Sequence, residues 1–388
     1  MSEQDGLAPE VVGELDSANL QELNDLQTAW NEDEKHYEEK DGVIEVDGRQ
    51  YQFKVSFLNL RSDEINSSFS TNRRAITEVA PNLGRDARHD IVVPVLPGFG
   101  ETTAQFEGDF LNLVLEALKE SGFENPKVLG VNSLGKGTPE YVQDESRGRI
   151  STIGMMDGIN DSANIANILA ARGYFGNKGF LPNVAVMGHS MGSLDAISFM
   201  DVLNYGEGPG RRNRSEDLKV RKFLSMMPAV DGSFAMVRAR FLWAVRKQVF
   251  DSVKQAVSGT GAISLSKEDH HRIMFGDENF RDEEHFERGV PDSAKRFLQL
   301  TLNGKRRFGH VFKKDGTGDG VDLTVWKGGK DKLIPDNAIT DLPEFVGRNG
   351  SENKTEIVEL PDLSHSIPFR LRDAQRDQIK AALGKFFS

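Results

Sequence analysis

The chain has 388 residues, of which 38% are hydrophobic, and a formal net charge of −12. This length suits one large α/β domain with an insertion, or two domains, and the composition is that of a soluble protein with enough apolar residues for a core. The absence of cysteine excludes disulfides, thiolate metal sites and a cysteine nucleophile, and no apolar run of about 18 residues predicts a membrane span.

Most of the negative charge lies in residues 1–41, which hold thirteen Asp or Glu and two Lys. Apolar residues recur there at helical spacing, so we predict an acidic, partly helical N-terminal arm. The arm is either a solvated extension or a segment that docks on a basic stretch such as 211–222 or 305–314. The first ten residues lack the apolar core of a signal peptide, which favours a cytoplasmic protein. Nucleic-acid binding is not expected, because no motif that recognises DNA or RNA accompanies the basic residues.

After the arm, predicted strands alternate with predicted helices. Residues 42–59 alternate apolar and polar side chains around Asp47 and Gly48, which is typical of a hairpin, and a polar, irregular stretch follows. The alternation beyond it predicts a mostly parallel sheet with helices on both faces. Strands are predicted within 91–96, 127–139, 220–230, 321–332 and 354–365, helices within 106–121, 161–175 and 372–387, and a strand, turn and helix in succession within 182–203.

In residues 232–318, predicted strands no longer alternate with predicted helices. These residues are predicted to form a mainly helical cap between two parts of the core, 42–231 and 319–388. An insertion at the carboxyl edge of such a sheet lies over the crevice where ligands bind. Its apolar side chains suggest a substrate with an apolar acyl or aryl group, although they also suit packing of the cap on the core. They are Phe234, Met236, Phe241, Trp243 and Phe250.

Ser190 lies between Gly188 and Gly192 in the sequence GHSMG. A serine nucleophile in this motif needs a buried strand before it and a helix after it, and the residues on either side predict both. The glycines are required because neighbouring chains approach the turn closely. The helix N-terminus favours developing negative charge. We therefore predict that Ser190 is a nucleophile.

A serine needs a general base, and the base needs an acid that orients it. Of eight histidines, His365 follows a C-terminal strand at a strand-to-loop junction and is the predicted base. Asp331 follows the preceding strand and is the predicted acid, and Asp231 is the alternative. We expect His189 to fill space within the elbow. We expect His270, His271 and His285 to face solvent.

The tetrahedral intermediate needs two backbone N–H donors for its oxyanion. Met191, which follows the nucleophile, is one predicted donor. Phe99, in the glycine-rich loop at 96–101, is the other, although this loop could also be a simple turn.

Two possible metal signals are discounted. Residues 315–322 resemble a calcium loop but lack the expected acid at the twelfth position, where Trp326 stands. The sequence at 269–271 places an aspartate and two histidines side by side, and adjacent side chains seldom converge on one ion. We expect no metal and no cofactor.

Taken in chain order, these motifs resemble the α/β-hydrolase superfamily, in its esterase- and lipase-like members with a serine nucleophile. The resemblance spans roughly residues 88–388 and implies a cap after the sixth core strand. Two positions depart from the common pattern of the family: Pro97 where many members have His, and Asn132 where many have Asp. These departures affect substrate placement more than the type of reaction.

The resemblance and the residues together imply a cofactor-free serine hydrolase that acts on a small carboxylic ester through an acyl-enzyme. The same triad also suits a thioesterase, lactonase, amidase, C–C hydrolase or acyltransferase. A binding protein that uses the pocket as a receptor is the alternative from another class.

Overall fold

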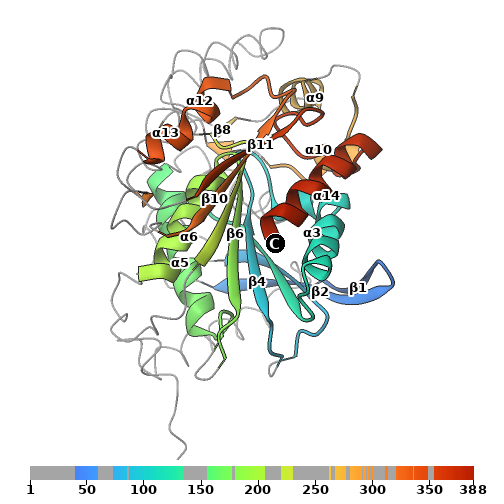
Figure 1. Ribbon diagram of the computed structural model, residues 1–388, viewed down its shortest axis with the longest axis vertical. Helices are drawn as coiled ribbons and strands as arrows, with labels where there is room; N and C mark the ends of the chain where they lie inside the picture. Colours follow the sequence, from blue (N-terminus) through green and yellow to red (C-terminus); the bar gives the residue numbers. More distant parts are fainter. Residues whose placement is uncertain are drawn as a thin grey trace, which may run out of the picture.

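The described part of the computed structural model contains a nine-stranded sheet with helices on both faces (Figure 1). The described residues are 40–59, 73–84, 87–134, 155–176, 180–205, 220–229, 262–263, 267–276, 280–290, 292–293, 295–296, 299, 311–312, 320–334, 336–347 and 354–388. The predicted N-terminal arm lies outside them, apart from Lys40 and Asp41, which already belong to the first strand.

The strand order is β1-β2-β3-β5-β4-β6-β7-β10-β11. The first three strands pair antiparallel, and β5 through β11 pair parallel, so the sheet is mostly parallel as predicted. The strands are β1 (Lys40–Val46), β2 (Arg49–Asn59), β3 (Arg73–Ala80), β4 (Ile91–Leu96), β5 (Pro126–Val131), β6 (Asn183–His189), β7 (Val220–Met226), β10 (Asp322–Gly328) and β11 (Thr355–Leu360).

The predicted hairpin at Asp47 and Gly48 is confirmed. Val46 pairs with Arg49, and the two residues between them have φ of 49° and 71°. Two consecutive positive φ values are typical of the turn whose twist matches the flanking strands, and Asp-Gly is favoured there.

The strand β3 was not predicted, because its residues lie in the polar stretch after the hairpin. Two of its charged side chains are paired inside the fold: Arg74 contacts Asp161, and Glu78 contacts Lys127 at 2.8 Å. These partners lie far along the chain, so the local pattern of residues gives no sign that the charges are compatible with a buried strand.

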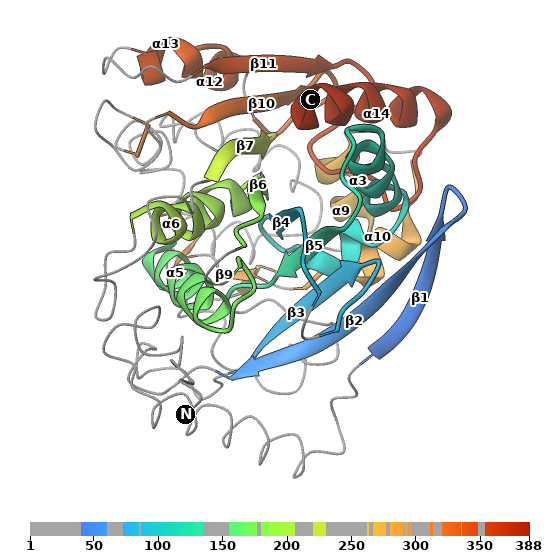
Figure 2. The same ribbon diagram turned by 60° about the horizontal axis from the view of Figure 1, so that its bottom comes forward.

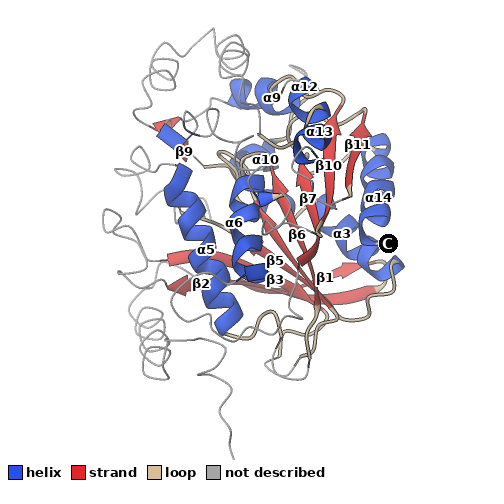
Figure 3. Ribbon diagram, turned by 60° about the vertical axis from the view of Figure 1, so that its left-hand side comes forward, coloured by secondary structure: helices blue, strands red, loops and turns tan. Residues whose placement is uncertain are grey.

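The sheet has a separate apolar core on each face. On one face lie α5 (Met155–Ala171) and α6 (Gly192–Tyr205), and on the other α3 (Asp109–Glu120) and α14 (Asp373–Phe387), as Figures 2 and 3 show. Both cores are built from apolar residues at helical spacing that meet the alternating faces of the strands. Ile165, Leu169 and Ile197 belong to the first core, and Phe110, Val114, Ile379 and Leu383 to the second.

The central strand β4 is buried along its whole length, as predicted for a strand covered on both faces. Pro94 lies within it although proline cannot donate a ladder hydrogen bond. On its β6 side, β4 pairs through Val92 and next through Val95. The two residues between them, one of which is Pro94, do not pair with β6, so this ladder is interrupted at the proline.

Described parts of the insertion lie at the carboxyl end of the parallel strands. Ser366, in the loop after β11, donates its N–H to Met274 O at 2.9 Å, and Phe369 N–H donates to Asp282 Oδ2 at 2.7 Å. The insertion includes β8 (Ala262–Ile263), α9 (Lys267–Phe275), α10 (Glu283–Glu287) and β9 (Asp292–Ser293); the remaining short elements are η1 (Thr103–Phe106), α12 (Asp336–Thr340) and α13 (Leu342–Gly347).

The predicted cap is therefore only partly described. Residues 230–261, which include Asp231 and the apolar set of the predicted cap, lie outside the described residues. Asp292 and Ser293 form a short strand within the insertion, which was predicted to be mainly helical. None of the helices in the described ranges has the length and apolar character needed to cross a bilayer.

Candidate active site

Ser190 lies in a sharp turn between β6 and α6, as the sequence predicted. It has φ of 50°, a left-handed conformation that is uncommon for a residue other than glycine. Its N–H donates to Met226 O on the neighbouring strand at 2.8 Å. This hydrogen bond contributes to holding the strained turn, which places the serine hydroxyl beyond the end of the sheet.

The two flanking glycines are required by close packing. A Cβ on Gly188 would lie 2.6 Å from Ser193 Cα, and a Cβ on Gly192 would overlap the carbonyl oxygens of Leu96 and Pro97. No real Cβ approaches backbone atoms so closely, so any side chain at these positions displaces the elbow or the adjacent loop.

A chain of hydrogen bonds links Ser190, His365 and Asp331. His365 Nε2 is 2.8 Å from Ser190 Oγ, and His365 Nδ1 is 2.9 Å from Asp331 Oδ2. A carboxylate only accepts, so Nδ1 carries the proton and Nε2 is left to accept the serine proton. The side chains of His365 and Asp331 are only 2% and 3% exposed, which shields both hydrogen bonds from water.

The other oxygen of Asp331 is held by the main chain. Oδ1 accepts the N–H of Leu333 at 2.7 Å and that of Ile334 at 3.0 Å. The carboxylate is therefore fixed in the loop after β10 with one oxygen directed at the imidazole.

Other carboxylates near these motifs have different surroundings. Asp336 begins α12 and is exposed. Asp362 pairs with Lys330 at 2.8 Å on the surface. Asp195 forms a buried ion pair with Arg296 at 2.5 Å, and the alternative acid Asp231 lies outside the described residues.

The loop at 96–101 lies directly beside the serine. A Cβ on Gly98 would be 2.9 Å from Ser190 Cβ. The Gly98 N–H donates to Glu101 Oε2 at 2.8 Å and is thus engaged within the loop. The next residue is Phe99, and Met191 follows Ser190 in the elbow, so both predicted oxyanion donors come from segments that adjoin the hydroxyl.

His189 belongs to a polar network that the sequence analysis missed. Its Nδ1 is 2.5 Å from Glu101 Oε2, and its Nε2 is 2.7 Å from the main-chain oxygen of His365. Both residues of the pair are buried. The sequence shows a histidine directly before the serine and a glutamate at the end of the glycine-rich loop, but it does not show that these two segments meet.

The prediction that His270, His271 and His285 face solvent is wrong, because all three are buried. His285 Nδ1 lies 3.0 Å from His270 Nε2 and 3.2 Å from Gln105 Nε2. Burial, and then neighbouring imidazoles, lower the pKa of His270 to about 4 and the pKa of His285 to about 3. Both rings are neutral near pH 7 and link α9 and α10 of the insertion to η1 of the core.

Hydrogen bonds join the insertion to the glycine-rich loop and the residues that follow it. Val290 N–H donates to Gly100 O at 3.0 Å, and Gly100 N–H donates to Asp292 Oδ2 at 3.2 Å. The hydroxyl of Thr102 donates to Arg288 O at 2.8 Å. The position of this loop therefore depends on the insertion.

Asn132, one of the two departures from the common pattern, is engaged within the protein. Its Oδ1 accepts the Thr103 N–H at 2.9 Å, and its Nδ2 donates to Thr103 Oγ1 at 2.8 Å and to Ala75 O at 3.2 Å. These bonds tie β5 to η1 and to β3.

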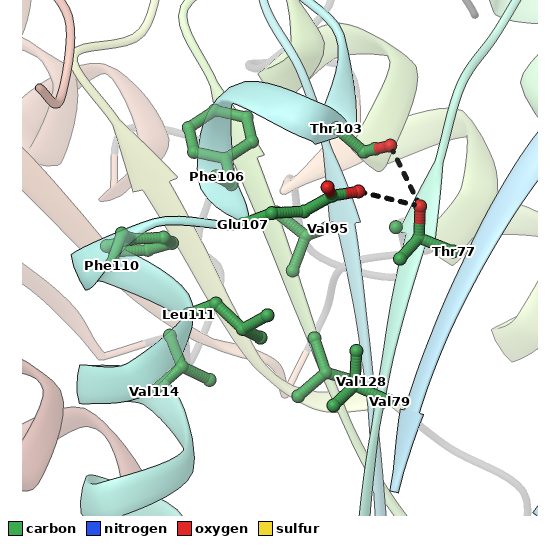
Figure 4. Close-up of a pocket in the computed structure, with 11 residues that line it drawn as sticks. Thr77, Val79, Val95, Thr103, Phe106, Glu107, Phe110, Leu111, Val114 and Val128 are labelled. Atoms are coloured by element: carbon green, nitrogen blue, oxygen red, sulfur yellow. Dashed lines mark hydrogen bonds between the residues drawn. The ribbon is translucent and has the colours of Figure 1, made fainter. Parts of the chain in front are cut away.

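A small apolar cavity lies between α3 and the sheet, with Thr77, Thr103 and Glu107 hydrogen-bonded at one side (Figure 4). Its volume of about 30 Å³ suffices for water but not for an acyl chain. Neither Ser190 nor His365 lines it, so this cavity is separate from the candidate active site. The lining residues are Thr77, Val79, Val95, Thr103, Phe106, Glu107, Phe110, Leu111, Val114, Val128 and Gly130.

Comparison by sequence gives no match to a family model and no significant match to a curated protein. Solved structures are similar in fold. A thermostable carboxyl esterase from Bacillus coagulans aligns with a TM-score of 0.50 at 14% identity, over 86% of this chain and 97% of that chain. A lipase in its open form aligns with a TM-score of 0.50 at 15% identity, over 86% of this chain and 98% of that chain. Together with the strand order and the elbow between β6 and α6, these similarities confirm that the chain has the α/β-hydrolase fold.

Proposed function

We propose that this protein is a serine hydrolase that cleaves a carboxylic ester. The observation that carries the proposal is the continuous chain of hydrogen bonds from Asp331 through His365 to Ser190, beside the glycine-rich loop. Spatial arrangement, rather than order in the sequence, identifies such a triad. The esterase and the lipase of the same fold support the ester as the substrate class.

In the proposed reaction, Ser190 Oγ attacks the ester carbonyl carbon while its proton passes to His365 Nε2. Asp331 keeps the proton on Nδ1 and stabilises the imidazolium that forms. The carbonyl oxygen becomes an oxyanion, which the N–H groups of Phe99 and Met191 would hold. The tetrahedral intermediate collapses when its C–O bond breaks and the imidazolium gives its proton to the departing alkoxide.

The resulting acyl-enzyme is hydrolysed by the same groups. His365 takes a proton from water, whose oxygen attacks the acyl carbon. A second tetrahedral intermediate then releases the carboxylic acid, and Ser190 Oγ regains its proton from the imidazolium. Every proton is carried by the chain's own residues or by water, so the reaction as written requires no cofactor.

The proposed substrate is a small ester with an apolar acyl or aryl group. This part of the proposal depends on the apolar residues of the predicted cap within 234–250, which the sequence places between β7 and β10. An insertion there lies over the carboxyl end of the sheet, where ligands bind in open α/β folds.

The test uses a fluorophosphonate probe and p-nitrophenyl esters of graded chain length. We expect covalent labelling of Ser190, ester turnover, and loss of both in Ser190→Ala. Ser198→Ala, a second buried serine, is the matched control and should retain both activities. Absence of labelling in the wild-type protein, or equal turnover in Ser190→Ala, would contradict the proposal. Labelling without ester turnover would still support Ser190 as the nucleophile. It would indicate that the protein cleaves a thioester, lactone, amide or C–C bond instead, or that it transfers acyl groups.

A further inference from the structure

A second buried histidine and carboxylate lie beside the proposed triad. His189 Nδ1 is 2.5 Å from Glu101 Oε2, and their side chains are 0% and 1% exposed. Glu101 also accepts the Gly98 N–H at 2.8 Å and the hydroxyl of Ser366 at 2.9 Å. The carboxylate thus contacts its own loop and the residue after His365, in addition to the histidine.

The partners of His189 decide its protonation. Nε2 faces the main-chain oxygen of His365 at 2.7 Å, and a carbonyl oxygen only accepts. Nδ1 faces the carboxylate of Glu101, whose Oε2 already accepts from Gly98. Two donating ring nitrogens make His189 an imidazolium, which forms an ion pair with Glu101.

The pKa shifts of both groups agree with an ion pair. Burial alone lowers the pKa of His189, but the charge of Glu101 and hydrogen bonds to Glu101 and His365 outweigh it, so the pKa is raised. Burial alone raises the pKa of Glu101. The charge of His189 and its hydrogen bond are the largest of the effects that lower this pKa, and the net result is a lowered pKa. Asp331 also raises the pKa of His189, whereas His285 and His365 also lower that of Glu101.

The ion pair joins the three segments that form the site. Glu101 belongs to the glycine-rich loop, His189 is bonded covalently to Ser190, and the His189 ring holds the backbone of His365. The distance of 2.8 Å between Ser190 Oγ and His365 Nε2 depends on the relative position of two of these segments. A shift of about 1 Å in such a distance costs on the order of 100-fold in rate.

We propose that the Glu101–His189 ion pair positions the general base His365 against Ser190. His189 acts through the backbone carbonyl of His365, and Glu101 keeps the His189 ring oriented and charged. Both are positioning residues, because neither is placed to contact the substrate. The proposal rests on the proposed hydrolase function and adds to it two residues that govern kcat.

Two substitutions of His189 separate its two hydrogen bonds. His189→Gln places an amide near the position of Nε2 and can still donate to His365 O. His189→Asn reaches only the position of Nδ1 and can still donate to Glu101. We expect kcat to fall about 100-fold in the Asn variant and by less than about tenfold in the Gln variant, with KM little changed in both.

Glu78→Gln is the matched control, because it neutralises another carboxylate of a largely buried ion pair, with Lys127. It should lower stability and leave kcat unchanged. The midpoint of thermal unfolding, measured for every variant, reports the structural cost separately from the kinetic one. Equal kcat losses in the Asn and Gln variants, or losses that simply follow the unfolding midpoint, would overturn the positioning role.

Nuclear magnetic resonance of ¹⁵N-histidine tests the inference independently of catalysis. We expect the imidazolium of His189 to lose its proton only at a pH above the ordinary histidine pKa of about 6.5, and the His365 Nδ1–H resonance to shift in the Asn variant more than in the Gln variant. A His189 that titrates at or below that value, or an unchanged His365 resonance in both variants, would refute the proposal. If the wild-type protein neither labels nor turns over esters, the proposed function fails, and these resonances still decide whether the pair positions His365.

Discussion

Arg74 on β3 and Asp161 on α5 form a two-point ion pair, with Nε–Oδ2 and Nη2–Oδ1 distances of 2.7 Å, although 87 residues separate them. Their side chains are 1% and 3% exposed. Asp161 Oδ2 also accepts the Leu134 N–H at 2.7 Å, in the loop after β5. One buried carboxylate therefore joins a strand, a helix and a loop near the carboxyl end of the sheet.

Removal of the arginine alone should be costly, because it leaves a buried and unpaired carboxylate. We expect Arg74→Met to lower the free energy of unfolding by about 3–5 kcal/mol. The double variant Arg74→Met/Asp161→Asn removes the charge and keeps an acceptor for Leu134, so it should recover most of this loss. Chemical denaturation measures both. Lys119→Met, which breaks an exposed pair with Asp47, is the control and should cost less than about 1 kcal/mol.

The proposed orienting acid, Asp331, gives the second prediction. Asp331→Asn keeps the shape of the side chain but can no longer fix the proton on His365 Nδ1, so we expect kcat to fall about 10⁴-fold. The fold should be retained, which circular dichroism can verify. Asp336→Asn, at the start of α12, changes an exposed carboxylate nearby and should leave kcat within about twofold of wild type. A similar loss in the two variants would remove Asp331 from the proposed triad.

The elbow gives the third prediction. A Cβ on Gly192 overlaps the main chain of Leu96 and Pro97, so Gly192→Ala should displace the glycine-rich loop and abolish labelling by the fluorophosphonate probe. Gly384→Ala is the matched control, because nothing lies within 4 Å of its Cβ position in α14. A helical Gly→Ala change there should raise stability by about 0.5–1 kcal/mol and leave labelling intact. Normal labelling of Gly192→Ala would show that the loop tolerates the displacement.

The buried histidines of the insertion give the fourth prediction. His270 and His285 have pKa values lowered to about 4 and about 3, whereas an unfolded histidine titrates near ~6.5. Between these values the unfolded chain binds protons that the folded chain does not, so stability should fall as the pH falls from about 6.5 towards 4. The raised pKa of His189 acts in the opposite sense, since its contribution is present below about 6.5 and is lost only as the pH rises through the folded value.

Urea unfolding at pH 7.5 and at pH 5 measures this dependence. His270→Phe removes one of the buried bases from a site already lined by Phe275 and Phe286. We expect the variant to lose less stability between the two pH values than the wild-type protein does. An equal loss in the two proteins would assign the acid sensitivity to other groups.

The elements around Ser190 could be predicted because their signals are local. The strand β6, the turn and α6 are contiguous, and Asp331 and His365 follow strands whose apolar patterns are clear. Since parallel strands share a carboxyl edge, the order of the motifs alone brings the three residues towards one place.

The features that escaped prediction depend on partners far along the chain. His189 and Glu101 are 88 residues apart, and no local pattern indicates that a polar residue in the elbow is half of an ion pair. The same holds for β3, whose Arg74 is acceptable inside the fold only because of Asp161. Likewise His270 and His285 lie in acidic sequence, and their burial follows from packing against each other and Gln105.

The separation of Ser190 and His365 by 175 residues has a consequence for synthesis of the chain. Ser190 leaves the ribosome before Asp331 and His365, which follow β10 and β11, the last two strands of the described sheet in chain order. A nascent chain therefore carries Ser190 without its hydrogen-bond partner His365 until the sheet has been completed at that edge. The proposed hydrolytic activity would therefore first appear only after β10 and β11 have joined the sheet.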